Sequence, residues 1–376
     1  MRAVDHSPSD RATPGRNVTV LGIETSCDET AAAVVRIPGS GPAQVLSSIV
    51  ASQIEAHAPF GGVVPEIAAR AHVENIEAIV AQALEAAGMA AREVDAIAAT
   101  AGPGLVGGVM VGLAFGKAMA LALRKPLIAV NHLEGHALSA RLGAEAPYPF
   151  LLLLVSGGHC QLLEVAGVGA CTRLGSTIDD AAGEAFDKIG AALGLAYPAG
   201  PALERLAEGG DPMRYALPRA LLGRPGCDFS FSGLKTAAAR IAQALSTQAE
   251  RRDLAAATQA AIAGQLSERT ARAMAGYAQK HPPGERRFVV AGGVAANEEV
   301  RSRLQALCEG MGFSFAAPPL AYCTDNAAMI ALAGAERLCA GMTDALDAPA
   351  RPRWPLDAAA AAERPTHVPG RKGAKA

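Results

Sequence analysis

Charged residues are scarce in this chain: Asp, Glu, Lys and Arg together make up only 19% of its 376 residues. The 34 Lys and Arg nearly balance the 36 Asp and Glu, which leaves a formal net charge of -2. A chain with this balance has no overall field that would attract a nucleic acid or an acidic membrane. A local basic patch or a partner would have to supply the cations for any nucleic acid.

Two further absences concern export. The seven cysteines are scattered, form no C-x-x-C pair and are odd in number. This pattern does not fit a disulfide framework and favours a reducing compartment, so we expect a cytoplasmic protein. Residues 1–17 are polar and lack the apolar run of a signal peptide, and we expect a disordered N-terminal tail.

Apolar residues are plentiful, at 50% of the chain, and a chain of this length tends to form two domains. The best candidate for a membrane span is residues 104–123, where Gly108, Gly112 and Gly116 repeat the small-residue spacing of membrane helices. Glycines interrupt the segment and Gly-Pro-Gly opens it. We therefore favour a buried helix with close backbone packing and expect no membrane.

Two kinds of segment occur twice in the chain. Residues 18–37 and 149–168 are each an apolar run, a small polar turn and a second apolar run, which predicts a β-hairpin. Residues 95–123 and 287–307 are each a β-rich run, a glycine-rich turn and a helical pattern. This repeated order predicts a mixed α/β protein of two related lobes with a cleft between them.

We place the first lobe at residues 18–148 and the second at 149–324, with an insertion around 205–250. A helix near 325–345 is expected to pack back on the first lobe. Residues 348–376 are rich in proline and end in basic residues, so we expect a flexible tail there.

Glycine turns at the ends of strands suggest a bound nucleotide, because backbone N–H groups and helix N-termini bind phosphate. Ser156, Gly157 and Gly158 form such a turn, Gly200 precedes a proline at a helix start, and Asn297 follows a glycine pair. An amide at that last position would bind a base or a ribose. Ordinary turn chemistry is the alternative for each.

Two histidines suggest a metal. His132 and His136 are four residues apart, so on a helix they lie within about 40° of one face and could share one ion. In the metallopeptidase motif H-E-x-x-H the glutamate follows the first histidine, whereas Glu134 is two residues on. The carboxylate must therefore come from elsewhere. Asp325 offers one, and the alternative interpretation is that it caps a helix that begins near Asn326.

Residues 176–188 carry four acids in one predicted helix: Asp179, Asp180, Glu184 and Asp187. A solvated acidic face is the alternative. The intervening alanines, Gly183 and Phe186 instead favour close approach to another group.

Several motifs, taken together and in order from Val18 to Gly341, carry a family resemblance. They are ETSCDET, HAPFGGVVPEIAARAHVENI, GPGLVGGVMVG, NHLEGH, LVSGGH, GSTIDDAAGEAFDK, YPAGP, DFSFSGLKTA, AGGVAAN and CTDNAAMIA. With them the chain resembles the bacterial tRNA adenosine threonylcarbamoyltransferases. The resemblance implies an α/β fold of the two-lobed actin-like ATPase type. It also implies transfer of threonylcarbamoyl from threonylcarbamoyl-adenylate to the exocyclic amine of adenosine at position 37 of tRNAs that read ANN codons, with release of AMP.

The resemblance also implies roles for individual residues. One divalent metal per subunit, iron(II) or zinc, would be held by His132, His136 and Asp325. The residues implied to contact substrate are Leu154, Val155, Ser156, Gly157, Gly158, Asp187, Gly200 and Asn297. Glu204, one helical turn beyond Gly200, is a further candidate, although family members often carry Asp there.

The implied partners are an inactive paralogue that forms a heterodimer with this chain and a small ATPase, while a separate enzyme makes the adenylate. The reaction is acyl transfer to a weakly nucleophilic aromatic amine, so the protein must supply positioning, charge stabilisation and proton removal. The sequence does not identify the base, for which Asp28, Glu29 and Asp180 are candidates. A basic patch for tRNA is expected from these residues: Arg214, Arg219, Arg224 and Lys235.

Two other functions stay open. A metallopeptidase could use the histidine pair with a remote acid, but the displaced Glu134 counts against it. An actin-like ATP-binding regulatory module would bind nucleotide in the same cleft, but it would have no use for the histidine pair.

Overall fold

The computed structural model describes residues 17–142 and 146–364, and the chain divides into two compact units. Unit 1 consists of Met1–Ser52, Ala68–Glu145 and Asn326–Pro352. Unit 2 consists of Gln53–Ile67, Ala146–Asp325 and Arg353–Ala376.

The core of unit 1 is a five-stranded mixed sheet with strand order β3-β2-β1-β4-β5. Its strands are β1 (Val18–Glu24), β2 (Glu29–Ile37), β3 (Gln44–Ser52), β4 (Ala96–Gly102) and β5 (Leu127–Asn131). The strands β1, β2 and β3 are antiparallel neighbours, whereas β1, β4 and β5 run parallel. The predicted hairpin over residues 18–37 is confirmed.

The sheet of unit 2 repeats this topology, with strand order β10-β9-β6-β7-β8. Its strands are β6 (Phe150–Val155), β7 (Cys160–Gly167), β8 (Ala170–Ser176), β9 (Arg287–Ala291) and β10 (Ser314–Ala316). Again the first three strands are antiparallel, and β6, β9 and β10 are parallel. The prediction of two related halves is therefore confirmed strand by strand.

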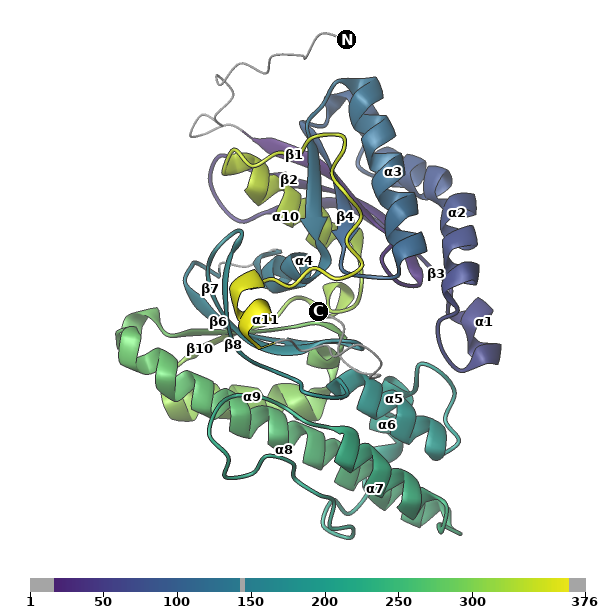
Figure 1. The fold of residues 1–376 in the computed structure, drawn as a ribbon, viewed down its shortest axis with the longest axis vertical. Coiled ribbons are helices and arrows are strands. Elements are labelled where there is room, and N and C mark those ends of the chain that lie inside the picture. The colour runs from purple at the N-terminus through teal and green to yellow at the C-terminus, as the bar shows by residue number, and fades with distance from the viewer. Residues whose placement is uncertain (1–16, 143–145, 365–376) are drawn as a thin grey trace. The chain divides into compact units, whose positions relative to one another are not determined.

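Helices cover both faces of the unit 1 sheet, with α3 (Val106–Leu123) on one face and α10 (Ala327–Cys339) on the other (Figure 1). Glycines permit this close packing. A Cβ on Gly22 of β1 would lie 2.5 Å from the carbonyl oxygen of Ala327, and one on Gly116 of α3 would lie 2.8 Å from the Cβ of Ala99. Unit 1 also contains α4 (His132–Leu138) and most of α2 (Pro65–Ala86).

Helix α3 is long and apolar enough to span a membrane by length and composition alone, and a third of it is buried. Its glycine face packs on the sheet, which confirms the predicted close backbone packing. The prediction of a buried helix was wrong for the opposite side, where Val106, Met110 and Leu121 are more than half exposed.

Five helices of unit 2 contribute to one apolar core. They are α5 (Ala182–Ala192), α6 (Ala199–Ala207), α7 (Ser232–Ala242), α8 (Gln248–Lys280) and α9 (Glu298–Met311). Unit 2 also contains the short helices α1 (Ile54–His57) and α11 (Ala358–Glu363). Short 3-10 helices occur in both units: Ala58–Phe60, Ala91–Glu93, Ser139–Arg141, Pro283–Glu285, Gly293–Ala296 and Leu320–Tyr322.

The structure differs from the expected flexible tail over residues 348–364, which make specific contacts. In unit 1 the backbone N–H of Arg351 donates to the carbonyl of Ala101 at 2.7 Å. In unit 2 Asp357 caps α11 and accepts a hydrogen bond from the backbone N–H of Arg173, whose buried guanidinium donates to the carbonyls of Ala360 and Arg364. These hydrogen bonds hold the segment in place, and sequence periodicity does not reveal them. The rest of the expected tails, residues 1–16 and 365–376, lies outside the described residues.

Candidate metal and substrate sites

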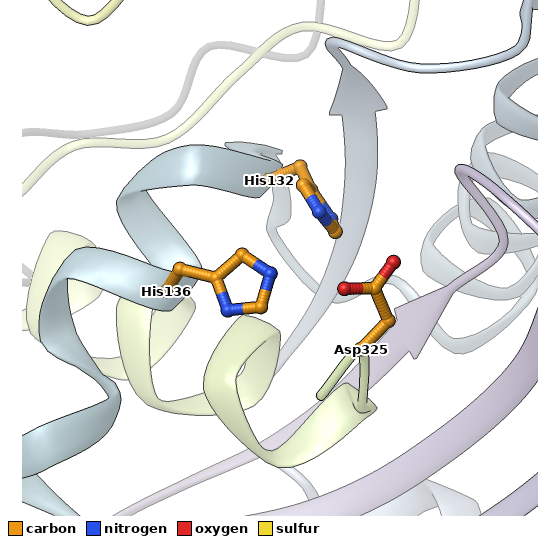
Figure 2. A group of neighbouring side chains, drawn as sticks. All are labelled: His132, His136 and Asp325. Carbon is orange, nitrogen blue, oxygen red and sulfur yellow. The ribbon is translucent and has the colours of Figure 1, made fainter. Parts of the chain in front are cut away.

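His132 and His136 come together because α4 begins directly after β5. Asn131, the last residue of β5, caps the helix by accepting a hydrogen bond from the N–H of Leu133 at 2.9 Å. The two imidazoles then lie one helical turn apart, with ring centroids 4.7 Å apart. Figure 2 shows both rings and the carboxylate of Asp325 pointing toward one another.

His132, His136 and Asp325 each offer a ligand atom, and these atoms all lie within 4.8 Å of one another. Both histidines are buried and Asp325 is half-buried. Two imidazoles and one carboxylate suit a divalent transition metal and leave coordination positions for other ligands. The group can therefore hold a metal ion.

The alternative reading of Asp325 as a helix cap was wrong. Asn326 is the cap of α10, because its side chain accepts a hydrogen bond from the N–H of Met329 at 3.0 Å. Sequence could not decide between these neighbours, since Asp and Asn cap helices equally well.

Glu24, at the end of β1, is a site residue that the sequence analysis missed. Its side chain is 1% exposed, and its Oε2 lies 2.9 Å from Nδ1 of His132. The backbone N–H of Ser26 donates to Oε1 at 2.6 Å, and the hydroxyl of Thr100 donates to Oε2 at 2.8 Å. The one available signal was an acid that ends an otherwise apolar strand.

The turn that contains Ser156, Gly157 and Gly158, here called the Ser156 turn, connects β6 to β7. Leu154 and Val155 are the last residues of β6, and the N–H of Ser156 donates to the carbonyl of His159 at 2.8 Å. Side chains added at Gly157 or Gly158 would meet no atom within 4 Å, so both glycines border open space. This exposed turn leaves room for a ligand beside the backbone.

The first turn of α5 packs directly on the Ser156 turn. The N–H groups of Gly183 and Glu184 donate to the carbonyls of Ser156 and Gly157. A Cβ on Gly183 would lie 2.6 Å from the carbonyl oxygen of Ser156, which explains why the helix has glycine at this point.

The carboxylates of Asp187 and Glu204 accept hydrogen bonds from backbone N–H groups at the starts of two helices in unit 2. Asp187 on α5 accepts from the N–H groups of Ala199 and Gly200 at 2.8 and 3.1 Å, at the start of α6. Glu204 on α6 accepts from the N–H of Glu298 at 2.7 Å, at the start of α9.

Asn297 precedes Glu298 and is the cap of α9. Its Oδ1 accepts from the N–H of Val300, and its Nδ2 donates to Gln259 Oε1, both at 3.0 Å. Asp187, Gly200, Glu204 and Asn297 are thus linked through α5, α6 and α9, although sequence separates them by up to 110 positions.

Burial raises the pKa of Asp187 from its ordinary value, and the hydrogen bonds from Ala199 and Gly200 oppose this rise. A carboxylate in this position is costly to ionise, and the two backbone donors offset part of that cost.

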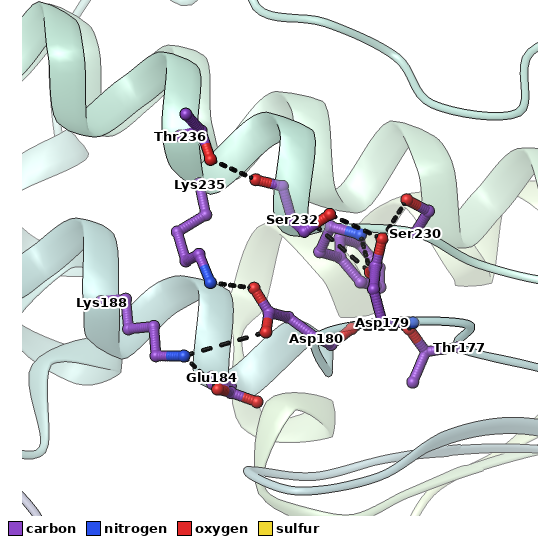
Figure 3. Close-up of polar contacts among 10 residues, drawn as sticks. Thr177, Asp179, Asp180, Glu184, Lys188, Ser230, Ser232, Lys235 and Thr236 are labelled. Atoms are coloured by element: carbon purple, nitrogen blue, oxygen red, sulfur yellow. Dashed lines mark hydrogen bonds and ion pairs between the residues drawn. The ribbon is translucent and has the colours of Figure 1, made fainter. Parts of the chain in front are cut away.

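The acids of residues 176–188 do not share one helix, because α5 begins only at Ala182. Asp179 instead lies at the N-terminus of α7, where it accepts hydrogen bonds from the backbone N–H of Phe231 and the hydroxyl of Ser232, both at 2.7 Å. Asp180 is buried, its carboxylate in contact with the ammonium of Lys235 and 3.8 Å from that of Lys188 (Figure 3). The prediction of one helix was wrong because hydrogen bonds and an ion pair with residues 230–235, more than 50 positions away, hold the first two acids in a loop.

The remaining candidate bases lie in unit 1, at the turn between β1 and β2. Asp28 is 6% exposed, and Glu29 is the first residue of β2. Among the described residues Asp28 has no hydrogen bond or ion pair.

Glu134 lies on α4 between the two histidines in sequence, but its Oε2 pairs with the guanidinium Nη1 of Arg337 at 2.9 Å. Its carboxylate is therefore paired with a residue of α10. Structure and sequence agree that Glu134 does not replace the metallopeptidase glutamate, which directly follows the first histidine in that motif.

Comparison with protein families decides the identity of the chain. Residues 44–332 match the model of the TsaD family, described as tRNA N6-adenosine threonylcarbamoyltransferase. The chain belongs to this family.

Two relatives of the tRNA N6-adenosine threonylcarbamoyltransferase family show how far the similarity extends. The enzyme of that name from Caulobacter vibrioides is 73% identical over 360 residues, which cover 96% of this chain and 98% of the relative. That from Maricaulis maris is 57% identical over 377 residues, which cover 99% and 100%. The predicted family resemblance is confirmed over nearly the whole chain.

Solved structures support the fold of this family member. Full-length HypF, in its phosphate- and nucleotide-bound form, matches with a TM-score of 0.53 at 13% identity, over 86% of this chain and 46% of HypF. HypF of T. kodakarensis gives a TM-score of 0.52 at 13% identity, over 87% and 48%. At this identity the likeness concerns the fold alone, which is the predicted α/β fold of the actin-like ATPase type.

Proposed function

We propose that this chain transfers the threonylcarbamoyl group from threonylcarbamoyl-adenylate to the exocyclic amine of adenosine at position 37 of tRNAs reading ANN codons, releasing AMP. The family to which the chain belongs shows the coarser activity, that of a threonylcarbamoyltransferase acting on tRNA adenosine. The observation that carries the proposal is that the family match includes both histidines of the metal group and Asp325.

We propose iron(II) or zinc as the ion held by His132, His136 and Asp325. A divalent ion with open positions would supply Lewis-acid polarisation of the acyl donor or a hold on its threonyl end. The three side chains fit either metal by their donor chemistry, because imidazole and carboxylate bind both.

The adenylate is assigned to the Ser156 turn and the capped helix starts of unit 2. The open backbone at Gly157 and Gly158 supports a phosphate there, since turn N–H groups bind anions. Asp187 and Asn297 are proposed to contact ribose or base, with Gly200 and Glu204 beside them. Their present hydrogen bonds fix the backbone of α6 and α9, so the same side chains would combine structural and ligand-binding roles.

Asp28 is the candidate base that the contacts favour. The carboxylate of Asp180 is already engaged in an ion pair with the ammonium of Lys235. Asp28 is buried and has no such partner among the described residues, while Glu29 is less buried. The base would take the proton that the adenosine amine loses when its bond to the carbamoyl carbon forms.

The chain is further proposed to work in the cytoplasm, as a heterodimer with an inactive paralogue and together with a small ATPase. None of the seven cysteines, all of which lie in the described part of the chain, forms a disulfide, in keeping with a reducing compartment.

The test is a reconstituted reaction. The purified chain is mixed with the paralogue, the ATPase and the adenylate-forming enzyme, together with threonine, bicarbonate, ATP and a tRNA transcript. Mass spectrometry of the digested tRNA should detect threonylcarbamoyladenosine, and a reaction without this chain is the control. Unmodified adenosine in the complete reaction would contradict the proposed function.

A further inference from the structure

We propose that Glu24 is a positioning residue of the metal site, which holds the imidazole of His132 through Nδ1 and leaves Nε2 as the nitrogen that binds the ion. The inference rests on the proposed metal site and adds a residue that is not itself a ligand. It assigns a function to an acid that lies at the end of an apolar strand.

The distances define the tautomer of His132. Nδ1 lies 2.9 Å from the Glu24 carboxylate oxygen Oε2, which can only accept a hydrogen bond while it is ionised. Nδ1 therefore carries the proton in the neutral ring, and Nε2 has the free lone pair. A metal ligand must present such a lone pair, so the pairing selects the nitrogen for the ion.

The carboxylate of Glu24 is itself held from two sides. The backbone N–H of Ser26 fixes Oε1 at 2.6 Å, and the hydroxyl of Thr100 on the neighbouring strand β4 fixes Oε2 at 2.8 Å. The hydroxyl of Ser26 also lies 3.1 Å from Nδ1 of His132. These contacts lie within unit 1, so strands β1 and β4 determine the direction of the carboxylate and thereby that of the ring.

A purely structural role explains this arrangement less well. Burying a carboxylate costs free energy unless it is paired, and an apolar side chain at the end of β1 would avoid that cost. The acid has a specific benefit behind a metal-binding histidine, because it fixes the ring and increases its basicity. Loss of such a partner typically weakens metal binding by about 10–100-fold.

The experiment compares zinc binding by the full chain and its variants in competition with a chromophoric chelator. Glu24→Gln keeps the size of the side chain and removes its charge. We expect its zinc dissociation constant to rise by about 10–100-fold. Glu134→Gln is the matched control, since Glu134 is equally buried and lies on the same helix as His132, but pairs with Arg337. Its zinc affinity should stay within about twofold of the wild type.

Circular dichroism and thermal unfolding without zinc establish that each variant is folded. A folded Glu24→Gln chain that binds zinc as tightly as the wild type would overturn the inference alone. Absence of zinc binding by the wild type, with the same result for His132→Ala, would overturn the metal site and this inference with it. Equal weakening in both glutamine variants would show a general effect of buried carboxylates and would also overturn the specific role. If Glu24→Gln fails to fold, a second variant, Thr100→Val, tests the same idea because it removes one hydrogen bond to the Glu24 carboxylate. This variant should bind zinc more weakly than the wild type. An unchanged zinc affinity of Thr100→Val would overturn the proposal.

Discussion

The carboxylate of Glu134 and the guanidinium of Arg337 form an ion pair of 2.9 Å that joins α4 to α10. The two residues are 203 positions apart, and their side chains are 3% and 16% exposed. The pair has two consequences. It holds α4, the helix that carries both histidines, against α10. It also occupies the carboxylate of Glu134, so this glutamate is not available for the role that a glutamate has in a metallopeptidase.

Glu134→Gln should therefore destabilise the fold without emptying the metal site. Removing the charge weakens a hydrogen bond between charged groups, which contributes about 1.5–3 kcal/mol to the free energy of unfolding. Urea unfolding measures this loss, and metal analysis of the same preparation should give the wild-type content. A loss of metal with little loss of stability would place Glu134 in the metal site after all.

His132→Ala and His136→Ala should each lose bound metal and transferase activity while the chain stays folded. Each substitution removes one of the three side chains that the described residues offer to the proposed ion. Elemental analysis of the purified variants, together with the reconstituted tRNA assay, tests this expectation. Unchanged metal content in the double variant would remove the ligand assignment.

The raised pKa of Asp187 predicts that the free energy of unfolding depends on pH. Its pKa in the folded chain lies above the ordinary 3.8, mainly because of burial, so the folded chain binds this proton more tightly than the unfolded chain does. The resulting stabilisation is full at pH values below the unfolded pKa and is lost as the pH rises through the folded pKa. Asp187→Asn keeps the Oδ1 acceptor for α6 but cannot ionise.

The stability of Asp187→Asn relative to the wild type should therefore be more favourable at pH 7 than at pH 4. Urea unfolding at both pH values gives the difference. A difference that does not change with pH would contradict the raised pKa.

Calorimetric titration with AMP should separately show weaker binding by Asp187→Ala, and wild-type affinity would place the nucleotide elsewhere.

Asn297 allows its structural and ligand roles to be separated. Asn297→Ala loses the cap of α9 and should cost about 0.5–2 kcal/mol of stability in addition to weakening AMP binding. Asn297→Asp keeps an acceptor for the N–H of Val300 but loses the amide donor. If both variants bind AMP like the wild type, the amide does not contact the nucleotide.

The four residues of the expected basic patch for tRNA fall into two pairs in the structure, one with acidic partners and one without them among the described residues. Lys235 contacts Asp180, and Arg214 lies 3.5 Å from Asp253, so both charges are partly neutralised. Arg219 and Arg224 are exposed, and their side chains have no ion pair with any described residue. The buried guanidinium of Arg269 donates to the carbonyls of Leu221, Arg224 and Gly226 and so fixes this part of the loop.

We therefore expect Arg219→Glu and Arg224→Glu to weaken tRNA binding by the assembled complex, and Arg92→Glu, on an exposed turn of unit 1, to leave it unchanged. Each lost phosphate contact should reduce the slope of log affinity against log salt by about one. Filter binding at several salt concentrations, with and without partners, measures the slope. Tight, salt-insensitive binding by the isolated chain would show that tRNA is not held by this patch.

Periodic patterns made the fold predictable. Both hairpins and both strand–glycine–helix segments follow from alternation and helical spacing. The histidine pair was predictable for the same reason, since both ligands lie on one short helix. The bounds of α5 were not, because Asp179 accepts hydrogen bonds from, and Asp180 forms an ion pair with, residues more than 50 positions away.

Glu24 shows the limit of sequence reasoning about the site. A single acid in a strand has no spacing to recognise, and its partners Thr100 and His132 are 76 and 108 positions away. Only the pairing of β1 with β4, and the position of α4 after β5, bring these groups together. Contacts of this range depend on the tertiary fold.

The repeated strand order of the two sheets gives the chain two equivalent strand ends that carry different groups. The strands β1 and β6 occupy equivalent places in their sheets. In unit 1 the strand ends in Glu24, beside His132 of the proposed metal group, and in unit 2 it leads into the open turn at Ser156. The same strand end therefore carries a buried acid in one unit and an open backbone turn in the other, so the two proposed sites can be altered by separate substitutions.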